Sequence, residues 1–128
     1  MARVYHVEIA RHAADADPKW VDNLLSHFSV PGVENARQGV ARRVTLSGVY
    51  HIALIRRLNR ELGLSVSSAV ALASRLLASD AARASVAPGL ELHIDRSAFE
   101  RDVDRRVSES VESSSRPRRG RPPRRRGE

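Results

Sequence analysis

The sequence has no cysteine, a single lysine and no long apolar run. Without cysteine, disulfide bonds, thiolate metal sites and cysteine nucleophiles are excluded. No run of about 18 apolar residues is present, so we expect no membrane span. The first residues also lack the apolar segment and cleavage site of a signal peptide. The sequence therefore predicts a soluble cytoplasmic protein.

Catalytic and metal-binding patterns are missing as well. The five histidines do not stand at metal-ligand spacings, and there is no Gly-rich phosphate loop or recognisable Ser/His/Asp set. The paired carboxylates Asp102 and Asp104 fall in a charged stretch that is typical of a solvated helix. We therefore expect no enzyme, no metal ion and no other cofactor.

The net charge of +7 is concentrated at the C-terminus. Residues 116–128 hold seven arginines and one glutamate, which leaves the rest of the chain nearly neutral. Any binding surface on the folded part must then come from local clustering of charge. A stretch of Arg, Pro, Gly and Ser cannot bury enough apolar surface to fold, so residues 113–128 are predicted to form a disordered tail.

Apolar residues at helical spacing predict two short helices in the N-terminal part of the chain. The first begins near Val4 and ends before the segment "DADP". Asp17 is a suitable N-cap, and Pro18 suits the first position of a second helix over 18–28. The apolar side of this second helix consists of Val21, Leu24, Leu25 and Phe28.

A small β-hairpin and two further helices follow. Gln38-Gly39 divides the basic segment 33–46 into two short strands. The next helix is predicted to start at Ser47 and to end at Gly63, which suits a left-handed C-cap. Ser65 then caps a further helix over the residues up to 78.

Residues 88–112 are predicted to form a strand and a helix that extend the domain. The inward residues of the strand are Leu90, Leu92 and Ile94. The apolar residues of the helix, which Asp95 or Ser97 caps, are Phe99, Val103 and Val107. Two uses stay open for this extension. It could form a homodimer through residues 88–107, or it could pack against its own domain.

The basic hairpin and the helix after it carry the most specific pattern. Gly39, Arg42 and Arg43 lie in the hairpin, and "LIRRLNRELGLS" runs from Leu54 to Ser65. This pattern resembles the winged helix-turn-helix of the MerR family of transcription regulators. The resemblance covers residues 4–78. It implies a DNA-binding domain, 1–80, that is mainly α with a small β-hairpin wing. Because the cysteines of metal-sensing members and their long coiled-coil helix are absent, it implies no small-molecule effector.

The polar side of helix 18–28 is the predicted DNA-reading surface. A helix in the major groove needs side chains that hydrogen-bond to base edges. Asn can form two hydrogen bonds to adenine, Lys can reach guanine or a phosphate, and an indole can pack on the backbone. The alternative is an ordinary solvated helix face. The candidate residues are Lys19, Trp20, Asn23, Ser26 and His27.

Arginines of the hairpin and the next helix are the predicted phosphate contacts. Alternation along a strand sends Arg42 and Arg43 to opposite faces, so we expect one of the two to contact DNA. Arg57 is expected to pair with Glu61 four residues on. The alternative for the hairpin is a solvated edge whose charges prevent aggregation. The candidate residues are Arg37, Arg42, Arg43, Arg56 and Arg60.

The tail contains a core that resembles an AT-hook, Arg119-Gly120-Arg121-Pro122. In this motif the two arginines lie along the narrow minor groove of an A·T tract. The glycine lets the backbone approach the groove floor. The outer arginines would contact phosphates, although Arg118 stands where the motif has proline. These outer residues are Arg118, Arg124, Arg125 and Arg126.

These patterns favour a bacterial DNA-binding protein, most simply a transcription regulator on the nucleoid whose partner is double-stranded DNA. Two alternatives stay open. A nucleoid-associated or architectural protein would bind duplex DNA through arginine with little sequence specificity. An RNA- or protein-interaction module would have similar helices without reading DNA.

Overall fold

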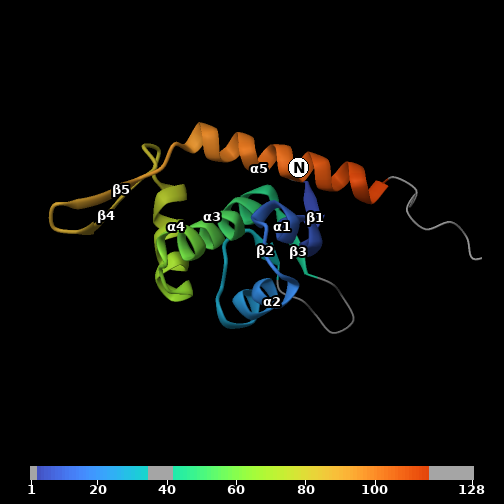
Figure 1. Cartoon of the computed structure of the whole chain (residues 1–128), viewed down its shortest axis with the longest axis horizontal. Coiled ribbons are helices and arrows are strands. Elements are labelled where there is room, and N and C mark those ends of the chain that lie inside the picture. The colour runs from blue at the N-terminus through green and yellow to red at the C-terminus, as the bar shows by residue number, and fades with distance from the viewer. Residues whose placement is uncertain (1–2, 35–41, 116–128) are drawn as a thin grey trace, which may run out of the picture.

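The computed structural model describes residues 3–34 and 42–115, and these ranges are mainly helical with a small antiparallel sheet (Figure 1). The candidate residues Arg37 and Arg118 to Arg126 therefore lie outside the described residues. The elements, in chain order, are β1 (Val4–His6), α1 (Val7–Ala14), α2 (Pro18–His27), β2 (Val33–Glu34), β3 (Arg43–Thr45), α3 (Leu46–Leu62), α4 (Val66–Ala78), β4 (Arg83–Ala87), β5 (Leu90–His93) and α5 (Arg96–Ser115).

The chain begins with a strand where the sequence predicted helix. Val4 to His6 form β1, which pairs antiparallel with β3, and α1 starts only at Val7. The His6 Nδ1 caps α1 by accepting a hydrogen bond from the Glu8 backbone N–H over 3.1 Å. The prediction was wrong because the pairing partner of β1 lies about 40 residues further along the chain, where local periodicity cannot detect it.

The break between α1 and α2 is three residues long. Asp15 ends α1 in the left-handed conformation, with φ of 53°. Asp17 is the extended N-cap of α2 and Pro18 occupies its first turn, as predicted. Among the described residues the Asp17 carboxylate makes no capping hydrogen bond, so the pre-set φ of Pro18 is the local signal that starts this helix.

The predicted hairpin is confirmed at both of its strands. β2 pairs with β3, with Val33 opposite Val44, and β1 adds a third strand on the other side of β3. Val44 is fully buried at the centre of this sheet. The turn, residues 35–41, lies outside the described residues.

Two glycines fix the hairpin against the start of α3. A methyl group on Gly48 would stand 2.6 Å from the Gly32 carbonyl oxygen, so only glycine allows the two backbones to come this close. Thr45 caps α3 by accepting from the Gly48 N–H and donating its hydroxyl proton to the Gly32 oxygen, each over 3.2 Å. The N-cap is thus Thr45 and not the predicted Ser47. The hairpin base is held rigidly on α3.

α3 and α4 follow the predicted boundaries closely. Gly63 ends α3 with φ of 68°, and the Ser65 hydroxyl caps α4 by accepting from the Ser68 N–H over 3.1 Å. These two helices contribute much of the core. Its largest fully buried side chains are Ile52, Ile55, Leu76, Val44, Val49 and Val103.

The C-terminal part contains one strand more than predicted. β4 pairs with β5 in a hairpin that projects from the helical body at the left of Figure 1. Leu90 does not point inward, as 59% of it is exposed. α5 lies across α1 and α3 and buries Phe99, Val103 and Val107 in the same core, which leaves the use of the strand before it open. It continues to Ser115, past the predicted start of the tail.

Within the described ranges, every helix is too short or too polar to cross a membrane.

Candidate nucleic-acid interface

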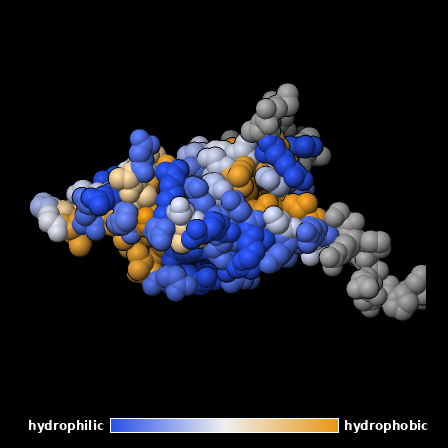
Figure 2. Space-filling model, turned by 90° about the horizontal axis from the view of Figure 1, so that it is seen from above, coloured by the Kyte–Doolittle hydropathy of each residue, from blue (hydrophilic) through white to orange (hydrophobic). Residues whose placement is uncertain are grey.

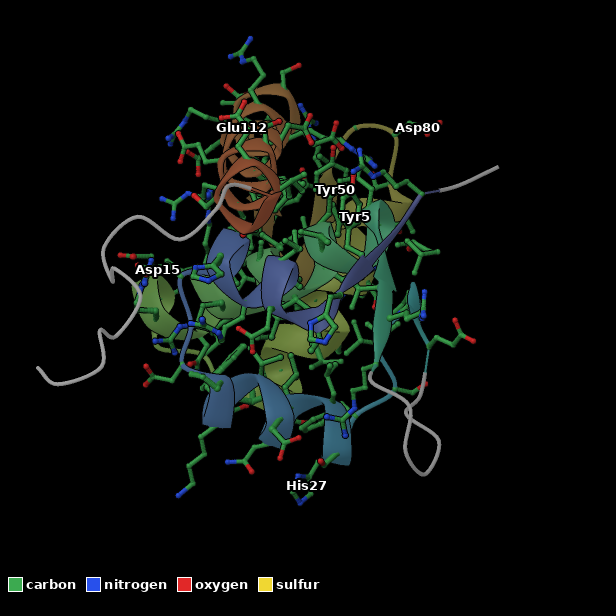
Figure 3. The ribbon with its side chains drawn as sticks, turned by 90° about the vertical axis from the view of Figure 1, so that its right-hand side faces the viewer. Tyr5, Asp15, His27, Tyr50, Asp80 and Glu112 are labelled. Atoms are coloured by element: carbon green, nitrogen blue, oxygen red, sulfur yellow. The ribbon has the colours of Figure 1, made fainter. Side chains whose placement is uncertain are left out.

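α2 stands at the outer edge of the molecule and presents a polar face to solvent. Val21, Leu24 and Leu25 are buried against the body. In Figure 3 the side chain of His27 points away from the body at the end opposite to Glu112 of α5. We call the exposed residues Lys19, Asn23, Ser26 and His27 the α2 face. Four of the five residues predicted on this helix are therefore exposed to solvent.

The fifth residue, Trp20, packs inside the protein. It is half-buried, and the guanidinium of Arg56 lies 5.0 Å from its ring centroid. Such a cation–π contact contributes roughly 1 kcal/mol. Arg56 also donates to the Asn59 side chain over 3.5 Å. Trp20 and Arg56 were predicted to contact DNA; the structure shows both half-buried and in contact with each other between α2 and α3, where they help to hold α2 to the domain.

Arg42 is also engaged within the protein. It precedes β3 and donates to the Asp22 carboxylate over 2.7 Å and to the Ser26 hydroxyl over 3.3 Å. Both partners lie on α2, so this arginine ties the hairpin to the helix. The side chain of Asp22 is 67% exposed, and its negative charge is neutralised by the guanidinium of Arg42 beside it. The sequence analysis missed Asp22 because its partner lies 20 residues away.

The other predicted arginines divide into one exposed residue and one paired residue. Arg43 is exposed on β3, in register with His6 on one side and Glu34 on the other. Arg60 binds Asp15 at the end of α1 over 3.1 Å, and the hydrogen bonds that its guanidinium donates to Asp15 and Glu61 raise its pKa. Of these two, only Arg43 forms no ion pair with the residues that the structure describes.

Arg57 does not pair with Glu61 as predicted. It forms an ion pair with Asp102 on α5, and its guanidinium lies 4.9 Å from the Phe99 ring centroid. Partial burial opposes ionisation of Asp102, but hydrogen bonds from Arg105 and Arg57 and the charge of Arg106 outweigh it and lower the pKa of Asp102. These contacts attach α5 to α3.

Tyr50 adds a second polar contact between the same two helices. Its hydroxyl donates to Asp104 over 2.6 Å. The pKa of the Tyr50 hydroxyl is raised above its ordinary value, mainly by burial and to a smaller extent by this hydrogen bond. Tyr50 and Arg57 therefore stabilise the packing of α5 against α3, on the side of the molecule away from the α2 face.

The polar groups of the α2 face are oriented by the helix itself. The His27 Nδ1 lies 2.8 Å from the Asn23 carbonyl oxygen. Because a carbonyl oxygen only accepts, Nδ1 carries a proton in this contact, and Nε2 is the ring nitrogen left for an outside partner. Within residues 3–34 and 42–115, no three histidine, aspartate or glutamate side chains come close enough to hold a metal ion. The α2 face therefore offers a ligand several hydrogen-bonding groups and the positive charge of Lys19.

Neither a protein-family model, nor a curated protein, nor a solved structure matches this chain.

Proposed function

We propose that the protein binds duplex DNA, with α2 in the major groove and the β2–β3 hairpin as a wing beside it. The observation that carries this proposal is the α2 face. One outer helix exposes Lys19, Asn23 and His27, while buried side chains hold its opposite side. A helix of this width fits the major groove, where each base pair presents a distinct pattern of donors and acceptors.

Each residue of the α2 face has a matching group on DNA. The Asn23 amide can form two hydrogen bonds to adenine, and Lys19 can donate to guanine or to a phosphate. The outward Nε2 of His27 can accept from an amino group of adenine or cytosine. These three side chains together favour sequence-dependent contacts over purely ionic ones.

The order of the elements supports a winged helix-turn-helix. α1, a three-residue break and α2 precede a hairpin that is anchored to the start of α3 through Gly32 and Gly48. Two contacts, Trp20 with Arg56 and Arg42 with Asp22, hold α2 in a fixed position against this frame. A reading helix needs such rigid support, because base contacts tolerate little displacement. Together with the sequence resemblance, this supports a transcription regulator of the MerR type.

The basic tail adds a second contact in this proposal. Arg119 and Arg121 would enter the minor groove of an A·T tract, and the outer arginines would bind phosphates. Because the tail is tethered to the domain, its binding is intramolecular once α2 has docked, so even a weak contact raises the affinity.

Selection of bound sequences from a random duplex library tests the proposal. The intact protein is expected to bind the selected site at least about a thousandfold more tightly than random duplex at the same salt concentration. Asn23→Ala should lose roughly 1–3 kcal/mol of discrimination at one base position. Ser67→Ala, an exposed change on α4, is the control and should lose none.

Two outcomes contradict sequence-specific binding. Equal affinity for selected and random duplex would favour an architectural protein that reads no bases. Displacement of duplex DNA by single-stranded RNA would favour an RNA-binding module.

A further inference from the structure

The β4–β5 hairpin, which we call the arm, exposes apolar side chains where it has no partner. Residues 85–91 at its outer end are all exposed, and they include Val86 at 52% and Leu90 at 59%. Among the described residues, its two strands pair only with each other. An isolated two-stranded hairpin is marginally stable in water, so the arm gains stability if another surface covers it.

An apolar groove lies at the base of the arm. It has a volume of about 370 Å³ and runs between the C-terminal half of α3 and the start of α5. Leu62 at its rim is 56% exposed. The lining is mostly apolar, with three charged side chains, and consists of Leu54, Leu58, Leu62, Leu92, Ile94, Ala98 and Phe99 together with Arg57, Glu61 and Asp95.

The groove and the arm form one continuous apolar strip. Leu92 lines the groove, and Leu90 stands two residues further out on the same side of β5. Three of the four exposed large apolar side chains of the described chain, Leu62, Val86 and Leu90, belong to this region. Figure 2 shows apolar surface at this end of the molecule, and further apolar patches near the opposite end of the same view.

The arm cannot fill its own groove. Leu92 at its base already forms part of the groove wall, and the extended strands carry Leu90 away from it. A second copy, turned by a two-fold rotation, would place its arm antiparallel on this strip. The outer Leu90 of each chain would then lie in the groove of the other. This arrangement is self-complementary, as a two-fold interface requires.

The charges of the arm permit such a pairing. Arg83 and Glu91 form a diagonal ion pair across the hairpin at 3.8 Å, and no further Lys, Arg, Asp or Glu is present between residues 83 and 93. The arm is therefore neutral overall. Two antiparallel arms would bring Arg83 of one chain towards Glu91 of the other, and these opposite charges attract each other. Two arms that carried charges of one sign only would repel each other.

We propose that two copies of this chain form a dimer by exchanging arms, with Leu90 of each chain packed on Leu62 of the other. Helix α5 contributes to this interface only where its first turns line the groove through Phe99, because Val103 and Val107 are buried in its own chain. In Figure 1 the arm and α2 lie on different sides of the molecule, so the dimer leaves the α2 face open. The inference goes beyond DNA binding and does not depend on it.

Sedimentation of the full chain without DNA tests the dimer. We expect a species of twice the chain mass of 14.2 kDa at high concentration. Leu90→Glu should weaken the dimer by roughly tenfold or more, because the new charge would be buried at the interface. Val4→Glu is the matched control, since Val4 is also an exposed apolar residue, at 43%, and lies on β1. Circular dichroism verifies that both variants are folded.

Cross-linking tests the exchange itself. The chain contains no cysteine, so single cysteines can be introduced without interference. A mixture of Leu90→Cys and Leu62→Cys chains should give a covalent dimer with a short bismaleimide, whereas a mixture of Leu90→Cys and Val4→Cys chains should not. A monomer at every concentration, a dimer that Leu90→Glu leaves intact, or failure of the first mixture to cross-link would each overturn the proposal.

Discussion

The Arg42 guanidinium donates to the Asp22 carboxylate over 2.7 Å and so joins the hairpin to α2. A second bond from the same guanidinium reaches Ser26 over 3.3 Å. The pair positions α2 relative to β3, and it also puts a carboxylate on the surface that we propose to meet DNA. This carboxylate would repel phosphates if Arg42 did not neutralise it.

We expect Asp22→Asn to strengthen binding to duplex DNA. The change removes one negative charge and releases Arg42 towards the phosphates, while the Trp20–Arg56 contact and the buried apolar side of α2 still hold the helix on the domain. Affinity should therefore rise by roughly fivefold, or about 1 kcal/mol, at moderate salt. The slope of log affinity against log salt concentration should steepen by about 0.9 for one new phosphate contact. Fluorescence anisotropy on a fixed duplex measures both quantities.

The control for this change is Glu109→Gln. Glu109 pairs with Arg105 on α5 over 3.0 Å and is similarly exposed, so the variant changes net charge by the same amount. Equal strengthening in both variants would show that only net charge matters and would contradict a contact role for Arg42.

Acid should weaken the attachment of α5 through Asp102. Its pKa is lowered in the folded protein by Arg105, Arg106 and Arg57, which outweigh the effect of burial. Its contribution is therefore fully present above the unfolded-state pKa of about 3.9 and is lost as the pH falls towards the folded-state value. Asp102→Asn should lower the free energy of unfolding by about 1 kcal/mol at neutral pH. The free energy of unfolding of this variant should also fall less steeply below a pH of about 4.

Urea unfolding between neutral and acidic pH measures this effect. Asp80→Asn, at an exposed position between α4 and β4, should leave the acid limb unchanged. If the Asp102 and Asp80 variants have parallel stability curves, the arginines do not stabilise the Asp102 carboxylate.

The local signals of the sequence were sufficient for α2, α3 and α4. Pro18, Gly63 and Ser65 act through the geometry of their own backbone or the next turn, so their effects can be predicted without a tertiary structure. β1 could not be predicted in this way, because its partner β3 lies about 40 residues further along the chain. β4 was missed although its partner β5 follows directly after the turn at Pro88-Gly89, because the sequence of β4 has no clear alternation of apolar and polar residues.

The candidate site also has features that local sequence signals predicted and features that they did not. The α2 face follows from helical spacing, because buried and exposed positions alternate with the period of the helix. The partners of the arginines do not follow from it. Arg42 with Asp22, Arg57 with Asp102 and Arg60 with Asp15 join residues 20 or 45 positions apart. Local spacing therefore identified arginines that could bind DNA, but it did not show which of them already form ion pairs within the protein.

Deletion of residues 116–128, directly after α5, should lower affinity for every duplex. Seven arginines are lost, and each phosphate contact that disappears should reduce the salt slope by about 0.9. The loss should be largest on A·T tracts, where the minor groove is narrow and its potential most negative. Titrations of A·T-rich and G·C-rich duplexes at several salt concentrations measure it. An unchanged slope would remove the tail from the interface.

The central claim is that α2 is the surface that meets DNA, and two charge reversals test it most directly. Lys19→Glu and Arg101→Glu change net charge equally, but Lys19 lies on the α2 face and Arg101 is exposed on α5. Binding of both variants to the selected duplex is compared at one salt concentration. We predict a loss of roughly tenfold or more for Lys19→Glu, and for Arg101→Glu only the small loss due to its long-range charge. Equal losses in the two variants would contradict the account.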